Sequence, residues 1–145
     1  MSINNGQRYL AFDYGEKRIG VASGNTLSHT TATLDTVANS SGTPDWQQLD
    51  DLVQTWQPVA LIVGDPLTET GEVVEITRQA RGFAKRLTKR YKLPVHTIDE
   101  RYSSIEASDR IKSLRRAGAR GRTQRGDIDK VAAALLMQRW FDENC

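Results

Sequence analysis

Residues 9–22 read YLAFDYGEKRIGVA, two apolar runs separated by a short polar break. Two such runs joined by a Gly-containing break predict a β-hairpin. Because side chains alternate along a strand, Tyr9, Ala11 and Asp13 should share one face of the first strand. An ionised Asp13 next to apolar neighbours is costly unless a positive charge meets it. A bound cation or an Arg or Lys partner would meet that need, and the plainer alternative is a strand-end Asp that caps a turn.

The length of 145 residues suits one compact domain, which we expect to span residues 1–145. No apolar stretch approaches the length of a membrane span and the first eight residues are polar, so we expect neither a signal peptide nor an anchor. The single cysteine, Cys145, excludes an internal disulfide framework and a thiolate-ligated zinc site. This usage fits a reducing, cytoplasmic compartment.

Apolar periodicity and turn residues predict the order β-β-β-α-β-α-β-α-α, an antiparallel meander followed by strands that alternate with helices. Such an order predicts an α/β domain with a mixed five-stranded sheet and helices on both faces. After the hairpin, the expected elements are a strand at 30–37, a helix at 44–57 with Thr43 as its cap, a strand at 59–63, a helix at 72–92, a strand at 95–99, a helix from Ser103 and a helix at 128–142. The helix at 72–92 should bury one apolar stripe, formed by Val73, Ile76, Ala80, Phe83, Ala84, Leu87 and Tyr91.

Two further acids are candidates to join Asp13. Glu100 directly follows the strand at 95–99, and strand ends in α/β sheets are where ligands gather, so we favour it over Asp99. In the last helix, Asp129 falls at the edge of the predicted buried stripe, whereas Asp127 is placed as the N-cap. The alternative for Asp129 is a favourable interaction with the helix dipole. The predicted stripe consists of Ile128, Val131, Ala132, Leu135, Leu136 and Trp140.

Asp13, Glu100 and Asp129 together would form an oxygen-only site, which suits Mg²⁺ or Mn²⁺ rather than zinc. Such ions can activate water and stabilise the leaving oxygen in phosphodiester hydrolysis. His29 and His96 belong to no recognisable catalytic motif.

Basic residues gather in two places although the net charge is only +2. Clustered cations on a near-neutral protein predict a polyanionic partner. The first set lies in a Gly-containing stretch predicted as a loop and comprises Arg110, Lys112, Arg115, Arg116, Arg120, Arg122 and Arg125. The second set lies on the predicted helix at 72–92, where a solvated helix face is the alternative; it comprises Arg78, Arg81, Lys85, Arg86, Lys89, Arg90 and Lys92.

Four blocks of the sequence resemble the YqgF family, RNase H-like proteins related to RuvC-type Holliday-junction resolvases and regarded as pre-16S rRNA nucleases. The blocks are FDYGEKRIGVA at 12–22, VGDPL at 63–67 with Gly71, DERYSS at 99–104 with Glu106 and Ala107, and Asp129 with the Ala-rich helix after it. They occur in order and span nearly the whole chain. The second block departs from the family pattern, because Asp65 replaces an apolar residue and Thr68 replaces a usual Asn.

The resemblance implies an RNase H-like fold and a divalent-metal nuclease site in which Asp13, Glu100 and Asp129 occupy the acidic positions. It also implies maturation of the 5′ end of 16S rRNA, in the bacterial cytoplasm and on ribosomal particles.

We therefore expect a metal-dependent endonuclease that acts on structured RNA. Lys17, Arg18 and Arg101 would position phosphates, and the stretch from Arg110 to Arg125 would grip the nucleic acid. One alternative keeps the chemistry and makes branched, four-way DNA the substrate. Junction resolution usually requires a symmetric dimer, and the sequence indicates only a monomer or a weak dimer. A non-catalytic RNA-binding module for ribosome assembly is a further alternative, and a nucleotide-binding domain of the actin and sugar-kinase type is disfavoured because that fold needs two such domains.

Overall fold

The computed structural model describes residues 7–28, 30–40, 42–99 and 125–144; for residues 125–130 it describes only their place in a helix. In chain order the elements are β1 (Arg8–Tyr14), β2 (Arg18–Asn25), β3 (Thr30–Ala38), α1 (Trp46–Trp56), β4 (Ala60–Asp65), α2 (Glu75–Tyr91), β5 (Val95–Asp99) and α4 (Arg125–Asn144). In the described part of the chain, no helix is both long and apolar enough to cross a membrane.

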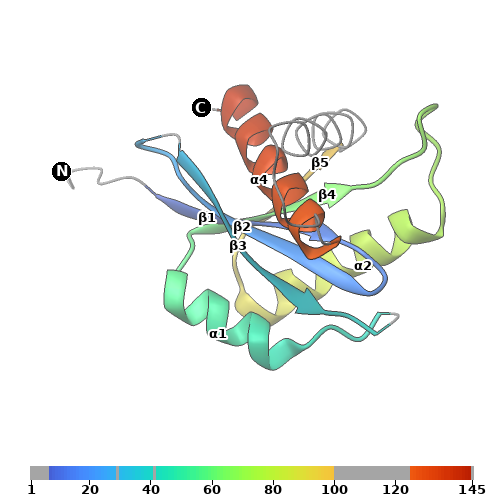
Figure 1. Ribbon diagram of the computed structural model, residues 1–145, viewed down its shortest axis with the longest axis horizontal. Coiled ribbons are helices and arrows are strands. Elements are labelled where there is room, and N and C mark those ends of the chain that lie inside the picture. Colours follow the sequence, from blue (N-terminus) through green and yellow to red (C-terminus); the bar gives the residue numbers. More distant parts are fainter. Residues whose placement is uncertain (1–6, 29, 41, 100–124, 145) are drawn as a thin grey trace, which may run out of the picture.

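The strands form one mixed sheet in the order β3-β2-β1-β4-β5, with β1 at its centre. β1, β2 and β3 pair antiparallel, whereas β4 pairs parallel with both β1 and β5. Helices α1 and α2 cover one face of the sheet and α4 crosses the other (Figure 1). The predicted five-stranded α/β architecture with helices on both faces is confirmed.

Alternating side chains of β1 enter two separate cores. Leu10 and Phe12 are fully buried in the core beneath α1 and α2. The rings of Phe12 and Phe83 pack edge to face, with 5.8 Å between their centroids. Tyr9 and Ala11 belong to the second core, beneath α4. Because β1 is buried on both faces, it can be apolar at nearly every position, and a charge on it stands out.

Helix α1 begins later than the sequence indicates. The predicted cap at Thr43 and first helical position at Pro44 are wrong, because Pro44 forms a bridge with Asn39 before the helix starts. Asp45 caps the helix instead, and its Oδ1 accepts from the Gln48 amide at 3.3 Å. Helix α1 packs on the core through buried Leu49 and the partly buried Trp46, Leu52, Val53 and Trp56.

Helix α2 also begins later than predicted, and the inward position expected for Val73 is wrong because that residue is 42% exposed. The preceding residues are held in a closed turn: the Glu72 amide donates to Thr68 Oγ1 at 2.9 Å, and the Thr68 amide donates to the Glu72 carbonyl at 3.1 Å. The rest of the predicted stripe packs against the core.

Helix α4 is longer than the predicted range of 128–142. Because it starts at Arg125, Asp127 lies inside the helix and the predicted N-cap role is wrong. Arg125 likewise belongs to the helix and not to the predicted basic loop. The helix predicted from Ser103 lies outside the described residues.

Candidate functional site

Asp13 lies near the carboxyl end of the central strand, on the face that α4 crosses. The alternation that sends Tyr9 and Ala11 into the core beneath α4 puts Asp13 on that same face, as predicted. Its side chain is half-buried. Directly opposite on β2 is Gly20, which has no side chain to occupy the space beside the carboxylate. A carboxylate in this position can accept hydrogen bonds or bind a cation.

The turn after Asp13 is tightly built. A Cβ on Gly15 would lie 2.6 Å from the carbonyl oxygen of Arg18, so only glycine fits this close backbone approach. Buried Asn39, the residue after β3, holds the turn in place: its Nδ2 donates to the Gly15 carbonyl at 2.7 Å and its amide donates to the Lys17 carbonyl at 3.0 Å. The turn therefore presents its polar residues from a defined backbone position.

Two of the predicted phosphate contacts border this turn. Lys17 is exposed, and Arg18 is half-buried as the first residue of β2. By strand alternation Arg18 shares a face with Gly20, which makes it a diagonal neighbour of Asp13, a separation that a long side chain can span. A cation beside a carboxylate lowers the cost of burying its charge. Arg18 and Asp13 both lie at the end of the sheet where β1 finishes and β2 begins.

The end of β5 is the position from which the second predicted acid would come. Ile98 is buried beneath α4, so the face of Asp13 continues onto β5. Asp99 belongs to the opposite face by alternation, which weakens its candidacy. An Arg139 guanidinium N–H on α4 donates to the Asp99 carbonyl and ties the helix to this strand end. Glu100 lies outside the described residues, as do Arg101, Arg110, Arg115, Arg116, Arg120 and Arg122.

The buried side of α4 differs from the predicted stripe. Ala133, Leu136, Met137 and Phe141 are fully buried, whereas Val131, Ala132, Leu135 and Trp140 are half-buried. Of the predicted stripe, Leu136 is buried and Trp140 flanks the core as expected, whereas Val131, Ala132 and Leu135 are not core residues. The side chain of Ile128 lies outside the described part of the structure. Position 129 belongs to α4 and precedes Ala133 by four residues, about one helical turn. The side chain of Asp129 lies outside the described part of the structure.

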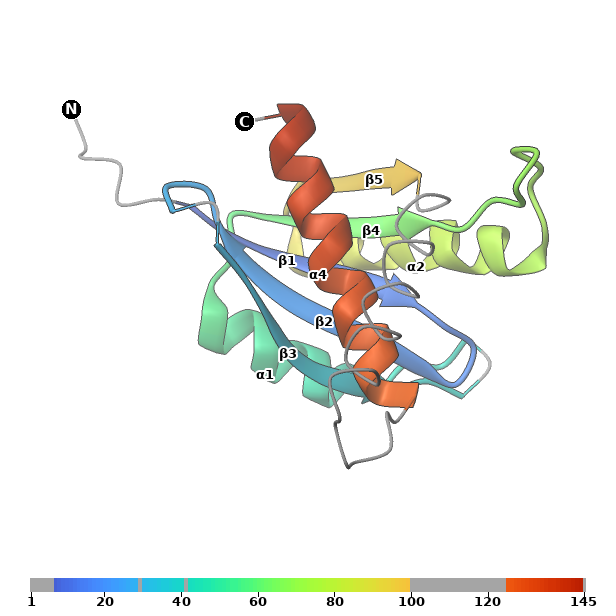
Figure 2. The ribbon, with the colours of Figure 1, turned by 45° about the horizontal axis from the view of Figure 1, so that its top comes forward.

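A close approach of α4 to the sheet sets this rotation of the helix. A Cβ on Gly24 of β2 would lie 2.7 Å from Met137 Cγ and 2.9 Å from Phe141 Cε2. On the same face, Ala11 of β1 and Ala22 of β2 are fully buried small residues. The small side chains let the sheet accept α4 at short range, and Figure 2 shows the helix running across β1, β2 and β4.

Asp65 replaces the apolar residue that the family pattern has in the second sequence block. It does not share a face of the sheet with Asp13, and its charge is paired. It accepts two hydrogen bonds from Arg81 of α2, at 2.8 and 2.9 Å. Alternation along β4 sends Ile62 beneath α4 and Asp65 to the other face. Thr68, the second departure, closes the turn before α2 described above.

Oxygen ligands from Asp13, Glu100 and Asp129 would fit a hard divalent cation, which prefers carboxylates. Among the residues whose side chains are described, no group of three or more His, Cys, Asp or Glu is close enough to hold a metal ion. Glu100 and the side chain of Asp129 lie outside the described residues. His96 is accounted for structurally, since its ring stacks on Trp140 with 5.0 Å between centroids; His29 is not described.

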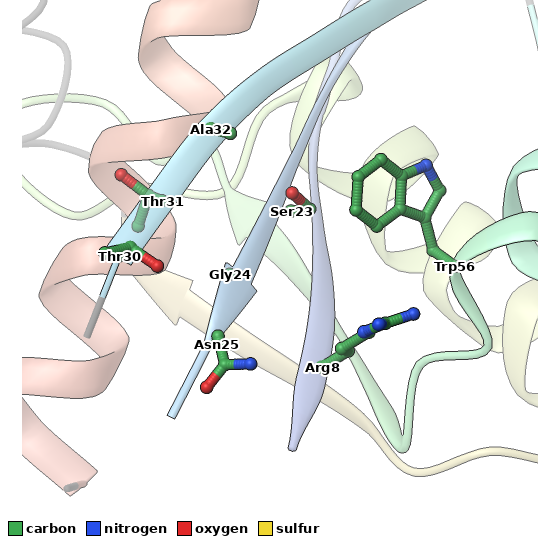
Figure 3. Close-up of a pocket in the computed structure, with 8 residues that line it drawn as sticks. All are labelled: Arg8, Ser23, Gly24, Asn25, Thr30, Thr31, Ala32 and Trp56. Atoms are coloured by element: carbon green, nitrogen blue, oxygen red, sulfur yellow. The ribbon is translucent and has the colours of Figure 1, made fainter. Parts of the chain in front are cut away.

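One pocket, of about 220 Å³, lies at the opposite end of β1 from Asp13. In Figure 3, Arg8 and Trp56 lie to the right of Ser23, and Thr30, Thr31 and Ala32 lie to its left. The remaining lining residues are Gly24 and Asn25. Because ligands of α/β sheets bind at the carboxyl ends of strands, this pocket is not part of the candidate site.

A family model described as "RuvX: Holliday junction resolvase" matches residues 7–143. The chain belongs to this family. It is a nuclease family, whose members are phosphodiester hydrolases, and the resemblance carried by the four sequence blocks is confirmed. A Pseudomonas putida relative named "putative pre-16S rRNA nuclease" is 42% identical over 93% of this chain and 94% of its own length. A Xylella fastidiosa relative of the same name is 42% identical over 91% of this chain and 85% of its own.

Solved structures similar to this family member are RuvC-type resolvases. Thermus thermophilus RuvC in complex with a Holliday junction has a TM-score of 0.53 at 14% identity and covers 94% of each chain. The Fowlpox virus resolvase in complex with junction DNA has a TM-score of 0.55 at 13% identity, over 94% of this chain and 97% of that one. At such low identity the likeness shows the fold alone, which is RNase H-like as predicted.

Proposed function

We propose that this protein is a divalent-metal-dependent endonuclease that cleaves structured RNA and matures the 5′ end of pre-16S rRNA during ribosome biogenesis. Asp13, Glu100 and Asp129 are the catalytic, metal-ligating carboxylates. One domain, residues 1–145, carries the activity as a monomer or weak dimer in the bacterial cytoplasm. The printed name of the relatives that are 42% identical supports the choice of RNA.

The observation that carries the proposal is the place of Asp13 on the face of the sheet that α4 crosses. Asp13 lies near the carboxyl end of the central strand, and α4, the helix that contains position 129, packs on this same face. Acids from a strand end and a helix that crosses it are the arrangement an oxygen-only Mg²⁺ or Mn²⁺ site needs. A bound ion would supply an activated water and neutralise charge on the leaving oxygen.

The other residues of the site act on the nucleic acid. Lys17 and Arg18, on either side of the turn fastened by Asn39, hold phosphates next to Asp13. Arg101 adds a further phosphate contact. The basic stretch then grips the strand farther from the cleaved bond, through Arg110, Arg115, Arg116, Arg120, Arg122 and Arg125.

The test is Mg²⁺-dependent cleavage of a precursor rRNA fragment by Asp13→Asn and Glu100→Gln. Loss of a direct ligand should reduce the rate by more than about 100-fold, since even outer partners of metal ligands are worth about 10–100-fold. Asp65→Asn is the matched control, because it removes a strand-end carboxylate on the other face of the sheet. Full activity in both site variants would refute the assignment. RNA binding that persists without carboxylate-dependent metal binding would instead identify a non-catalytic assembly module.

Cleavage of four-way DNA junctions is the second candidate, favoured by the description of the matching family. Side-by-side cleavage of the rRNA fragment and a synthetic junction separates the two substrates. Resolution of a junction needs paired cuts by a symmetric dimer, so sedimentation of the protein with junction DNA is the accompanying measurement. Preferential junction cleavage by a dimer would replace RNA as the substrate and leave the roles of the three acids unchanged.

A further inference from the structure

Helix α2 carries an unusual concentration of positive charge on the side of the sheet opposite Asp13. Between Arg78 and Lys92 the sequence has seven basic residues and no acid. Three of them are in ion pairs: Arg78 with Glu75 at 3.2 Å, Arg81 with Asp65 at 2.8 Å and Arg90 with Asp50 at 2.7 Å. The remaining four, Lys85, Arg86, Lys89 and Lys92, form what we call the α2 basic face.

The charges of the α2 basic face are not neutralised within the described ranges. No described carboxylate pairs with any of the four residues. Arg86 donates to the Gly42 carbonyl at 2.9 Å, and its guanidinium lies 5.8 Å from the centre of the Trp46 ring. These contacts orient the guanidinium but leave its full charge, so the face keeps a net positive potential.

Two grooves flank the exposed ridge of α2. One, of about 320 Å³, lies against the start of α1 and is lined by Trp46, Arg86, Lys89 and Arg90. The other, of about 400 Å³, lies against β5 and is lined by Asp65, Arg81, Ala84, Lys85, Thr88, Val95 and Thr97. Each groove therefore has cations on its wall, and the second also offers the exposed Thr97, since hydroxyls contact phosphate oxygens in nucleic-acid complexes. The Thr88 hydroxyl in that groove donates to the Ala84 carbonyl at 3.0 Å.

Helix stability alone does not account for this pattern. The helix dipole favours cations in the last turn, which explains Lys89 and Lys92. It does not explain Lys85, which stands four residues from both Arg81 and Lys89, because like charges at that spacing destabilise a helix. Positive charge that is present although it destabilises the helix indicates a partner of opposite charge.

A protein partner fits this surface less well than a nucleic acid. Protein interfaces have an apolar, charge-depleted centre. The exposed large apolar residues of the described chain are Leu27, Val59, Val73 and Val74, and none of them lines either groove. Lys and Arg side chains that pair with no described carboxylate, along an exposed helix, match the negative charge of a phosphodiester backbone instead.

We propose that the α2 basic face binds the phosphodiester backbone of the nucleic-acid substrate, on the layer of the protein opposite the candidate site. The inference rests on the proposed function, because only a large structured substrate could reach both layers. It adds a second contact that anchors RNA away from the cleaved bond and so favours folded precursors over short strands.

The test uses Lys85→Ala/Lys89→Ala and measures affinity for a precursor rRNA fragment by fluorescence anisotropy in EDTA, over a series of KCl concentrations. The matched control is Gln54→Glu/Thr55→Glu, which changes net charge equally on exposed positions of α1. Loss of two phosphate contacts should weaken binding about five- to thirtyfold. It should also lower the slope of log affinity against log salt by about 1.5. Circular dichroism checks that both variants fold.

Unchanged affinity and salt slope in the lysine variant would overturn the inference, and so would an equal loss in the α1 control. Because binding is measured without metal, this failure differs from failure of the proposed function. Wild-type protein that neither binds nor cleaves the RNA would refute the function itself, whereas wild-type binding and cleavage with an unaffected lysine variant would refute only the α2 contact.

Discussion

Asp65 at the end of β4 and Arg81 on α2 form an ion pair with two hydrogen bonds, Nε to Oδ1 at 2.8 Å and Nη2 to Oδ2 at 2.9 Å. The Asp65 side chain is 15% exposed and that of Arg81 45%. The pair holds a strand end to the helix on the face away from Asp13. Asp65 at the end of β4 and Asp13 near the end of the neighbouring parallel strand β1 thus lie on opposite faces of the sheet, and their substitution should have separable effects.

Asp65→Asn should leave metal-dependent cleavage within about twofold of wild type, whereas Asp13→Asn should abolish it. The expected structural effect of Asp65→Asn is a small decrease in Tm, because Arg81 lies at the surface and such pairs contribute little. Thermal melts and cleavage assays on the same samples check both parts. A cleavage defect in Asp65→Asn as large as that in Asp13→Asn would show that the β4 acid acts in the site.

Asp50 of α1 should make stability depend on acid pH. Its carboxylate accepts from Arg90 Nε at 2.8 Å, Arg90 Nη2 at 2.7 Å and the Tyr91 hydroxyl at 2.7 Å. Hydrogen bonds from Arg90 and then Tyr91 lower the pKa of Asp50 from its ordinary 3.8 to about 2. Because the folded pKa is below the unfolded one, the stabilisation is fully present above the unfolded pKa and is lost as pH falls through the folded value.

The measurement is urea denaturation of wild type and Asp50→Asn between pH 2 and pH 7. The difference in unfolding free energy should be constant near neutrality and shrink as the pH approaches about 2. Asp51→Asn, which removes the neighbouring exposed carboxylate of α1, controls for the change in net charge. A difference that stays constant down to the lowest pH would contradict the role assigned to Asp50.

Local patterns predicted the strands well because the apolar residues within each strand determine where it lies and which side chains it buries. The alternation in residues 9–13 correctly separated the two faces of β1, and β5 has the predicted bounds of Val95–Asp99. The face of α4 could not be read in this way, because its Ala- and Leu-rich sequence is apolar on several sides. The side of α4 that packs on the sheet depends on Gly24, more than 100 residues earlier, because the absence of a side chain there leaves room for Met137 and Phe141.

Long-range pairing also limited what the sequence could say about the candidate site. Asp65 could have joined Asp13 or faced solvent, and the outcome depends on Arg81, which only the folded chain brings within reach. The predicted start of α1 was wrong for a similar reason, since Pro44 forms a β-bridge with Asn39 across a loop. The roles of Glu100 and Asp129 stay predictions, because they concern side chains outside the described structure.

Gly24→Ala should destabilise the protein, because the added Cβ would meet Met137 and Phe141 at less than 3 Å. Overpacking of this kind costs about 1–3 kcal/mol. Gly82→Ala on α2 is the matched control: a Cβ there meets nothing within 4 Å, and removing a helical glycine should stabilise by about 0.5–1 kcal/mol. Urea denaturation of both variants measures the difference. Equal free energies of unfolding would contradict the close approach of α4 at Gly24.

Asn39 should support RNA binding indirectly, by holding the turn at residues 15–17 in place. Asn39→Ala removes the donor to the Gly15 carbonyl, and loss of this partly buried hydrogen bond costs about 0.5–1.5 kcal/mol of stability. Because the released turn carries Lys17, KM for the rRNA fragment should rise while kcat changes little, as expected for loss of a contact made equally in ground and transition states.

A double-mutant cycle with Lys17→Ala distinguishes this positioning role from general destabilisation. If Asn39 acts by holding the turn, the two substitutions affect the same contact, and their effects on KM should overlap instead of adding. Steady-state kinetics at a temperature well below the lowest Tm of the set avoids unfolded protein. Additive effects on KM would show that Asn39 supports the fold without positioning Lys17.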